Sequence, residues 1–81
     1  MDLSRIGHRL EVRFGLGSNP ELRRGLYRRI EKLVEAEGEE VYVLVSQVAA
    51  DAVGKRDEGR YFAFSVIRRL REHGYMAGID L

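Results

Sequence analysis

Alternation of apolar and polar residues marks the first predicted element of the chain. In HRLEVRF, residues 8–14, the side chains of Leu10, Val12 and Phe14 alternate with charged ones. A period of two places the apolar set on one face of a half-buried β-strand. The following GLGSNP contains two glycines and a proline, which interrupt a strand and suit the start of a helix. We therefore predict an N-terminal strand arm within residues 1–19.

A helical pattern follows over residues 19–37. Its apolar side chains recur at steps of three and four, which places them in one stripe along a helix. The stripe consists of Leu22, Leu26, Ile30, Leu33 and Val34, with Tyr27 at its edge. Ser18 or Asn19 can cap the start, and Ser18 with Glu21 has the spacing of a capping box. Gly38 is a natural C-terminal cap.

Two shorter elements are predicted in the middle of the chain. VYVL, residues 41–44, is β-branched and aromatic, which is typical of a short strand. SQVAADAVG follows it, with Ser46 as a candidate N-cap and Gly54 as a stop signal. These signals predict a strand and then a short helix.

The last third of the chain predicts a longer helix and a closing strand. After the polar turn KRDEG, Asp57 can cap a helix over residues 58–73, which Gly74 can end. YMAGIDL, residues 75–81, then predicts a strand. The predicted fold is a single α+β domain spanning residues 1–81, with three helices and a small β-sheet.

This order of elements, and a few residues within it, resembles the winged-helix branch of the helix-turn-helix superfamily over roughly residues 20–80. Family members carry a small residue in the first motif helix and often Gly four residues later, matched here by Ala50 and Gly54. Ala49 and Val53 fit as apolar partners. The buried stripe of the second helix would consist of Ala63, Val66, Ile67 and Leu70. The turn KRDEG is about three residues longer than the usual motif turn, and the two-stranded wing is incomplete.

The resemblance implies that the last helix reads double-stranded DNA. At 100° per residue, Tyr61, Ser65, Arg68 and Glu72 share its outer face. Tyr, Ser and Arg can contact base edges and phosphates from a major groove. A solvated face, with Arg68 and Glu72 paired at i, i+4, is the alternative.

Arginine usage adds candidate phosphate contacts. Twelve of the 14 basic residues are arginines, although the net charge is only +1. Arginine binds phosphate and guanine edges in a bidentate manner, but codon bias gives the same composition. Helix 19–37 begins with arginines and ends with glutamates, which is the reverse of what a helix dipole favours. That arrangement predicts a phosphate site or, alternatively, ion pairs within the helix. The candidate phosphate contacts are Arg23, Arg24, Lys55, Arg56 and Arg60, and Arg69 is a further candidate DNA-binding residue.

A protein-interaction module or homodimeric adaptor is the competing interpretation. Phe64 is the unexpected residue of the last helix, because an exposed Phe beside Tyr61 suggests a partner. The alternative is a core Phe64 that the rest of the domain covers. Leu10, Val12 and Phe14 would pair the N-terminal strand, within one chain or between two. Because an unpaired strand edge is a liability, we expect a homodimer.

Catalytic and cofactor chemistry finds no support in the sequence. There is no Cys, and His8 and His73 lie far apart with no metal-ligand spacing around them. Neither GLGSNP nor GKRD has the spacing of a phosphate-binding loop. We therefore expect a non-catalytic protein without metal, cofactor or small-molecule ligand. The chain has neither a membrane-spanning apolar run nor a signal-peptide stretch, so we expect a cytoplasmic location.

Overall fold

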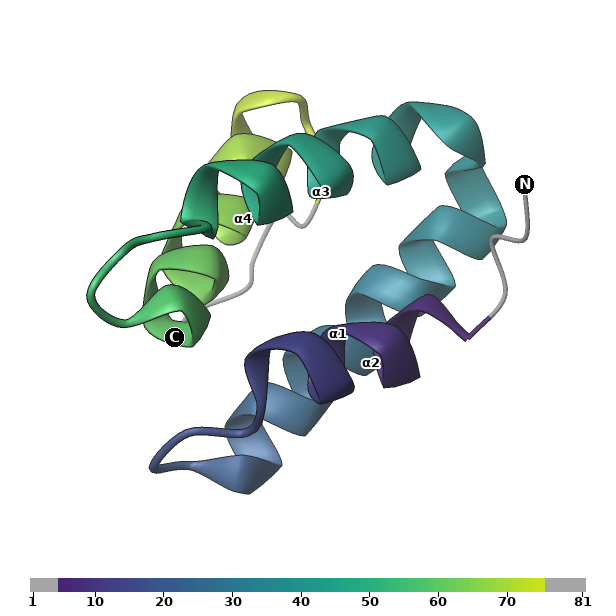
Figure 1. The fold of residues 1–81 in the computed structure, drawn as a ribbon. Coiled ribbons are helices and arrows are strands. Elements are labelled where there is room, and N and C mark those ends of the chain that lie inside the picture. The colour runs from purple at the N-terminus through teal and green to yellow at the C-terminus, as the bar shows by residue number, and fades with distance from the viewer. Residues whose placement is uncertain (1–4, 76–81) are drawn as a thin grey trace.

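The computed structural model describes residues 5–75, which form a small bundle of helices. The helices are α1 (Ile6–Phe14), α2 (Pro20–Glu37), α3 (Glu39–Ala52) and α4 (Glu58–Glu72). They are arranged as two pairs, α1 with α2 and α3 with α4, joined at the α2–α3 corner (Figure 1). Residues 5–75 contain no strand. The predicted α+β, winged-helix-like fold is therefore wrong, and the described chain is all-helical.

The predicted N-terminal strand is helix α1. Ile6, Leu10 and Phe14 are spaced four apart, so the same apolar residues also match one side of a helix. Ile6 and Leu10 are buried and Phe14 is half-buried, whereas Val12, which strand alternation had placed beside them, is 73% exposed. Three alternating residues were too short a pattern to distinguish the two periods, because Leu10 and Phe14 satisfy both.

The predicted strand VYVL is part of α3, which begins at Glu39 rather than near Ser46. Its buried residues recur at helical spacing along the whole helix: Val41, Val45, Val48 and Ala52. A valine costs less than about 0.7 kcal/mol in a helix relative to alanine. Burying its side chain gains about 1.5–3 kcal/mol, so packing outweighs the β-preference.

Other details of the winged-helix interpretation also fail. Ala50, the expected small residue at a helix crossing, is exposed, and Ala52 is the small residue that is buried. Val53 is also exposed rather than packed. The predicted last strand, residues 75–81, lies outside the described residues apart from Tyr75, which is not in a strand. The Tyr75 hydroxyl donates a hydrogen bond to Glu40 at 3.2 Å.

The two long predicted helices, α2 and α4, are confirmed. Asn19 caps α2 by accepting the Leu22 N–H at 3.2 Å, so Asn19 and not Ser18 makes the cap. Asp57 caps α4 by accepting the Arg60 N–H at 3.1 Å. Gly38 ends α2 and also precedes the first residue of α3, with φ +79°.

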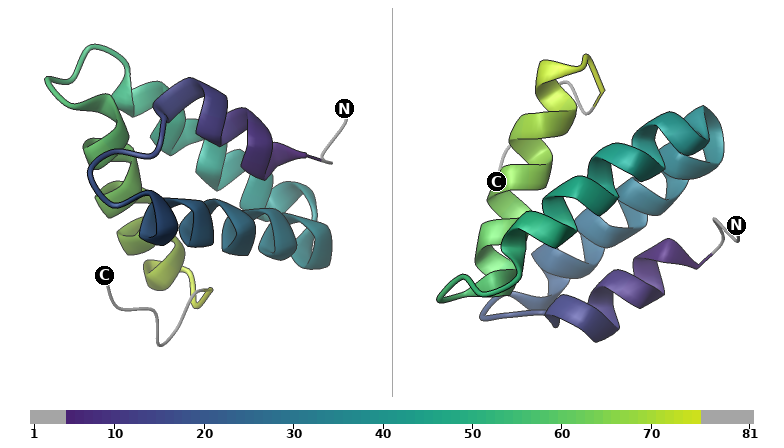
Figure 2. Two further views of the ribbon diagram at one scale, coloured as in Figure 1. Left: turned by 90° about the horizontal axis from the view of Figure 1, so that it is seen from below. Right: turned by 45° about the horizontal axis from the view of Figure 1, so that its top comes forward.

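Phe62 lies where α1, α2 and α4 meet. Its ring stacks on that of Phe14, with 4.4 Å between centroids, and lies 6.5 Å from that of Tyr27. The predicted stripe of α4 is buried, including Val66 and Leu70. In both views of Figure 2, α1 runs along α2. Asn19 and Leu22 from the start of α2 line one cleft with Asp57 and Arg60 from the start of α4. This proximity of two helix starts forms the site described next.

Candidate functional site

A cleft of about 360 Å³ opens between the first turns of α2 and α4. We call it the α2–α4 cleft. Phe14, Leu26 and Ala63 contribute apolar surface to it, and Leu22 and Phe64 contribute from α2 and α4 respectively. Its polar lining consists of Ser18, Asn19, Arg23, Asp57 and Arg60, with Gly17. The cleft therefore combines candidate residues of the DNA-binding and protein-interface interpretations.

Two large apolar side chains of the cleft remain accessible to solvent. Leu22 is 46% exposed and Phe64 is 55% exposed. Leu22 belongs to the first turn of α2 and Phe64 to the second turn of α4, so both lie near the starts of their helices. Exposed apolar side chains that gather in one place are typical of a surface that binds a partner.

The cleft has a positive rim. The Arg60 guanidinium lies 5.7 Å from the centre of the Phe64 ring. Both helices begin at the cleft, and the N-terminus of a helix carries a partial positive charge. Asp57 is the one acidic residue in the lining, and its carboxylate already accepts the Arg60 N–H. The site thus favours an anionic group beside an apolar one.

Arg23 is built into the structure rather than free to bind a ligand. It is half-buried, and a Cβ added at Gly59 would lie 2.8 Å from its Nη1 and 2.8 Å from the Phe14 carbonyl oxygen. Arg23 therefore fills the space between the α1–α2 loop and the start of α4. Burial raises the pKa of Tyr27, and the adjacent Arg23 opposes that shift. The Tyr27 hydroxyl donates to the Gly15 carbonyl at 2.7 Å, which holds the same loop.

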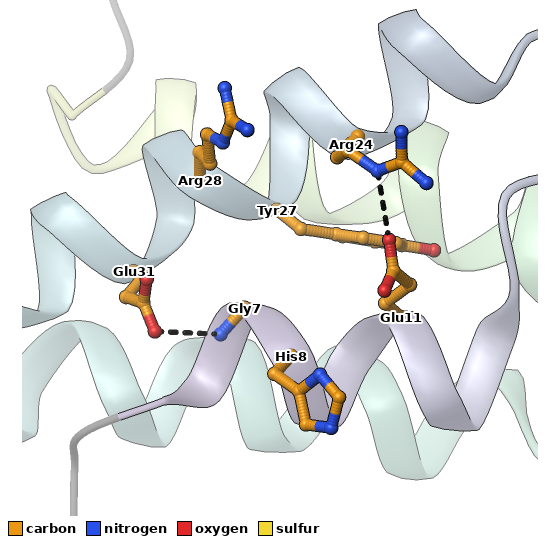
Figure 3. A pocket seen from close by; sticks show the side chains of 7 residues that line it. All are labelled: Gly7, His8, Glu11, Arg24, Tyr27, Arg28 and Glu31. Atoms are coloured by element: carbon orange, nitrogen blue, oxygen red, sulfur yellow. Dashed lines mark hydrogen bonds and ion pairs between the residues drawn. The ribbon is translucent and has the colours of Figure 1, made fainter.

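Arg24, the other candidate phosphate ligand of α2, lies on a different side of the helix. It pairs with Glu11 of α1 at 3.1 Å, in a second cleft of about 240 Å³ between α1 and α2 (Figure 3). Glu31 in this cleft accepts the Gly7 N–H at 3.3 Å. Figure 3 shows that His8 and Arg28 point away from each other. With both of its carboxylates engaged, this second cleft is the weaker candidate.

The predicted base-reading face of α4 is only partly open. Tyr61 and Ser65 are half-buried, and the ammonium of Lys55 lies 4.9 Å from the centre of the Tyr61 ring. Arg68 is exposed, with its Nε 3.9 Å from a Glu72 carboxylate oxygen, as the solvated-face alternative predicts.

The remaining basic candidates divide into two groups. Arg69 is half-buried and donates to the Gln47 side chain at 3.3 Å, which links α4 to α3. Arg56 and Arg60 are exposed. The structure therefore brings Lys55, Arg56 and Arg60 to the start of α4, with Arg68 two turns further along the helix, and separates them from Arg24.

The predicted protein-interface residues do not form one surface. Leu10 is a core residue and Phe14 stacks on Phe62, while Val12 lies exposed on α1 and Phe64 on α4. Leu22 was missed, because it was assigned to the buried stripe of α2. Its position in the first turn was the available signal, since the end of a stripe can extend beyond the elements that cover it.

Residues 5–75 contain no group of three or more His, Asp or Glu side chains that could hold a metal ion. No helix in this range is both long and apolar enough to cross a membrane. Comparisons with protein-family models, curated proteins and solved structures found no match to this chain.

Proposed function

We propose that this domain is a non-catalytic protein-binding module, and that its α2–α4 cleft takes an acidic, apolar segment of a partner. The observation that carries the proposal is the presence of Leu22 and Phe64, both about half exposed, in one cleft rimmed by Arg60. An amphipathic helix or extended segment would place apolar side chains between these two residues. Its carboxylates would lie near Arg60 and the helix starts.

The energetics favour such a ligand. Fully burying a Leu or Phe side chain gains about 1.5–3 kcal/mol, so covering the exposed halves of Leu22 and Phe64 gains roughly 1 kcal/mol each. A carboxylate near a helix N-terminus adds about 0.3–1 kcal/mol, more in a partly buried position. These contributions support a weak but charge-selective interaction.

A peptide titration tests the proposal. The probe is an amphipathic peptide of about four helical turns with Leu at anchor spacing and Glu elsewhere. The control peptide has Lys in place of Glu. We expect the acidic peptide alone to shift the backbone amide NMR signals of Leu22, Arg60 and Phe64. Phe64→Ala should weaken binding several-fold, whereas Val12→Ala, which truncates an exposed residue outside the cleft, should not. Equal binding of both peptides would contradict the proposal.

Double-stranded DNA binding by α4 is a second candidate function. It is favoured by the exposed cations at the start of α4, Lys55, Arg56 and Arg60, and by Arg68 further along the helix. Each phosphate that these residues neutralise would contribute about −0.9 to the slope of log affinity against log salt. Arg56→Ala should then flatten that slope by about one unit. Arg24→Ala should change the slope less, because the Arg24 side chain already pairs with Glu11. Absence of binding to any duplex at low salt would exclude this function.

A further inference from the structure

The middle of α3 is uncharged around its whole circumference. Residues 41–50, VYVLVSQVAA, contain no charged side chain, although charged residues make up 33% of the chain. The side of α3 that faces the core carries Val41, Val45 and Val48. A helix that is apolar or uncharged all round is typical of one covered on both sides. In the described chain, α3 is covered on one side only.

The opposite side of α3 forms an exposed strip, which we call the α3 strip. It consists of Val43, Ser46, Gln47 and Ala50, at i, i+3, i+4 and i+7. Val43 is 49% exposed, and the strip borders a shallow, largely apolar groove of about 460 Å³. Because Ser46 and Ala50 are small, another helix can approach this side closely.

The ends of α3 carry opposite charges. Glu39 and Glu40 form its first turn, and Lys55 and Arg56 follow its last turn. All four residues are exposed. Two acidic residues also lie near the basic end. Asp51 is about a quarter turn around the helix from Ala50 and therefore to one side of the strip. Asp57 follows Arg56, and its carboxylate accepts the Arg60 N–H at the start of α4.

We propose that a second copy of this chain covers the α3 strip, with the two α3 helices crossing antiparallel about a two-fold axis. In this arrangement the acidic end of each α3 meets the basic end of the other, so the charge attraction occurs twice. A parallel arrangement would instead place Glu39 and Glu40 beside their own copies. The surface is therefore self-complementary in one orientation only.

The dimer is independent of the proposed peptide-binding cleft. Gln47 of the strip contacts Arg69, which lies about 140° around α4 from Phe64. The two surfaces thus lie on different flanks of α4. The strip is about two turns long. This is at the low end of interface size, so we expect a dissociation constant on the order of tens of micromolar.

Sedimentation velocity over a range of concentrations tests the strip. The wild-type chain should become dimeric at hundreds of micromolar, and Ala50→Glu should remain monomeric. Val12→Glu, the same type of change on exposed α1 surface, should dimerise like the wild type. A wild-type chain that stays monomeric at these concentrations would overturn the proposal. A dimer that survives Ala50→Glu would overturn it as well, because the chains would then associate through another surface.

A charge-swap experiment tests the orientation. One variant carries Glu39→Lys and Glu40→Lys, so both ends of its α3 are basic. The other carries Lys55→Glu and Arg56→Glu, so both ends are acidic. Each variant alone should be at least several-fold weaker as a dimer than the wild type, and an equimolar mixture should form heterodimers. Circular dichroism confirms that both variants are folded. A folded single variant that dimerises as well as the wild type would overturn the antiparallel arrangement, because parallel helices already place like ends together in the wild type. A mixture that is no more dimeric than its folded components would overturn the charge pairing itself.

Discussion

The two helix pairs of this domain are held together in different ways. The α3–α4 pair is joined mainly by apolar packing, with Val45 and Val48 on one helix and Val66 and Leu70 on the other among the buried residues. The pair also has a hydrogen bond between the side chains of Arg69 and Gln47. Apolar packing depends little on pH or salt, so this pair should form the more robust half of the molecule.

The α1–α2 pair depends more on polar contacts. Helix α1 has nine residues, of which Ile6, Gly7 and Leu10 are buried. Polar contacts then fix it at several points, including the Arg24–Glu11 ion pair and an ion pair from Arg13 to Glu58 of α4 at 2.8 Å. The short helix is therefore held by a few buried side chains together with specific ion pairs, while the α3–α4 pair is held by shape and burial.

Removing apolar volume from the α3–α4 pair should have the largest effect. Leu70 is fully buried, so Leu70→Ala removes buried surface and leaves a cavity. We expect it to lower the free energy of unfolding by about 2–5 kcal/mol. Urea unfolding followed by circular dichroism measures this. The matched control is Leu22→Ala, which truncates a half-exposed leucine and should cost less than Leu70→Ala. Equal losses would contradict the assignment of the core.

Closing the space beside Gly59 should have the next largest effect, because it pushes the α1–α2 loop away from α4. In Gly59→Ala the new methyl group would meet the Phe14 carbonyl oxygen at 2.8 Å. The clash costs about 1–3 kcal/mol. Replacing Gly by Ala within a helix gains about 1 kcal/mol, so we expect a net loss of stability of up to about 2 kcal/mol. Gly25→Ala is the control, since a Cβ there meets no atom within 4 Å. It should raise stability by about 0.5–1 kcal/mol. Thermal unfolding of both variants should show shifts of opposite sign.

The smallest expected effect is a pH dependence that originates at Glu58. The Gly54 N–H, and then the Arg13 guanidinium, hold the pKa of Glu58 below its ordinary value. A lowered pKa in the folded state means that the contribution of Glu58 to stability is complete above the unfolded-state pKa of about 4.3. It is lost as the pH falls through the folded-state pKa.

Comparing unfolding midpoints at neutral and acid pH checks this assignment. Between neutral and acid pH, the stability of Glu58→Gln should decrease less than that of the wild type. Glu21→Gln changes the exposed first-turn glutamate of α2 and is the control, which should retain more of the decrease. If both variants behave like the wild type, the polar contacts of Glu58 do not help to hold α1 in place.

The sequence predicted the parts of the fold whose signals are local. Helices α2 and α4 carry long apolar stripes together with Asn19, Asp57 and Gly38 at their ends, and these signals agree with one another. α1 and the first half of α3 were assigned to strands, because HRLEVRF alternates and VYVL is rich in β-branched residues. Their helical state depends on burial against other helices, which no local pattern reports.

The same distinction applies to the candidate site. Phe64 could be singled out from its place in α4, and Arg60 from its charge. Leu22 could not be predicted as an exposed residue of the cleft, because its exposure depends on where α4 lies relative to the start of α2. Likewise, Arg23 could be predicted as a cation but not as a side chain packed against Gly59.

The one-residue corner at Gly38 also constrains how this chain can change over evolutionary time. Inserting one residue there would rotate α3 by about 100° about its own axis relative to α2. The valines of α3 that now face the core would turn to the side of the helix, and part of the α3 strip would turn towards the core. The loops before α2 and α4 are longer and can absorb insertions without rotating a helix. Natural length variation should therefore accumulate in those two loops and be rare at the corner.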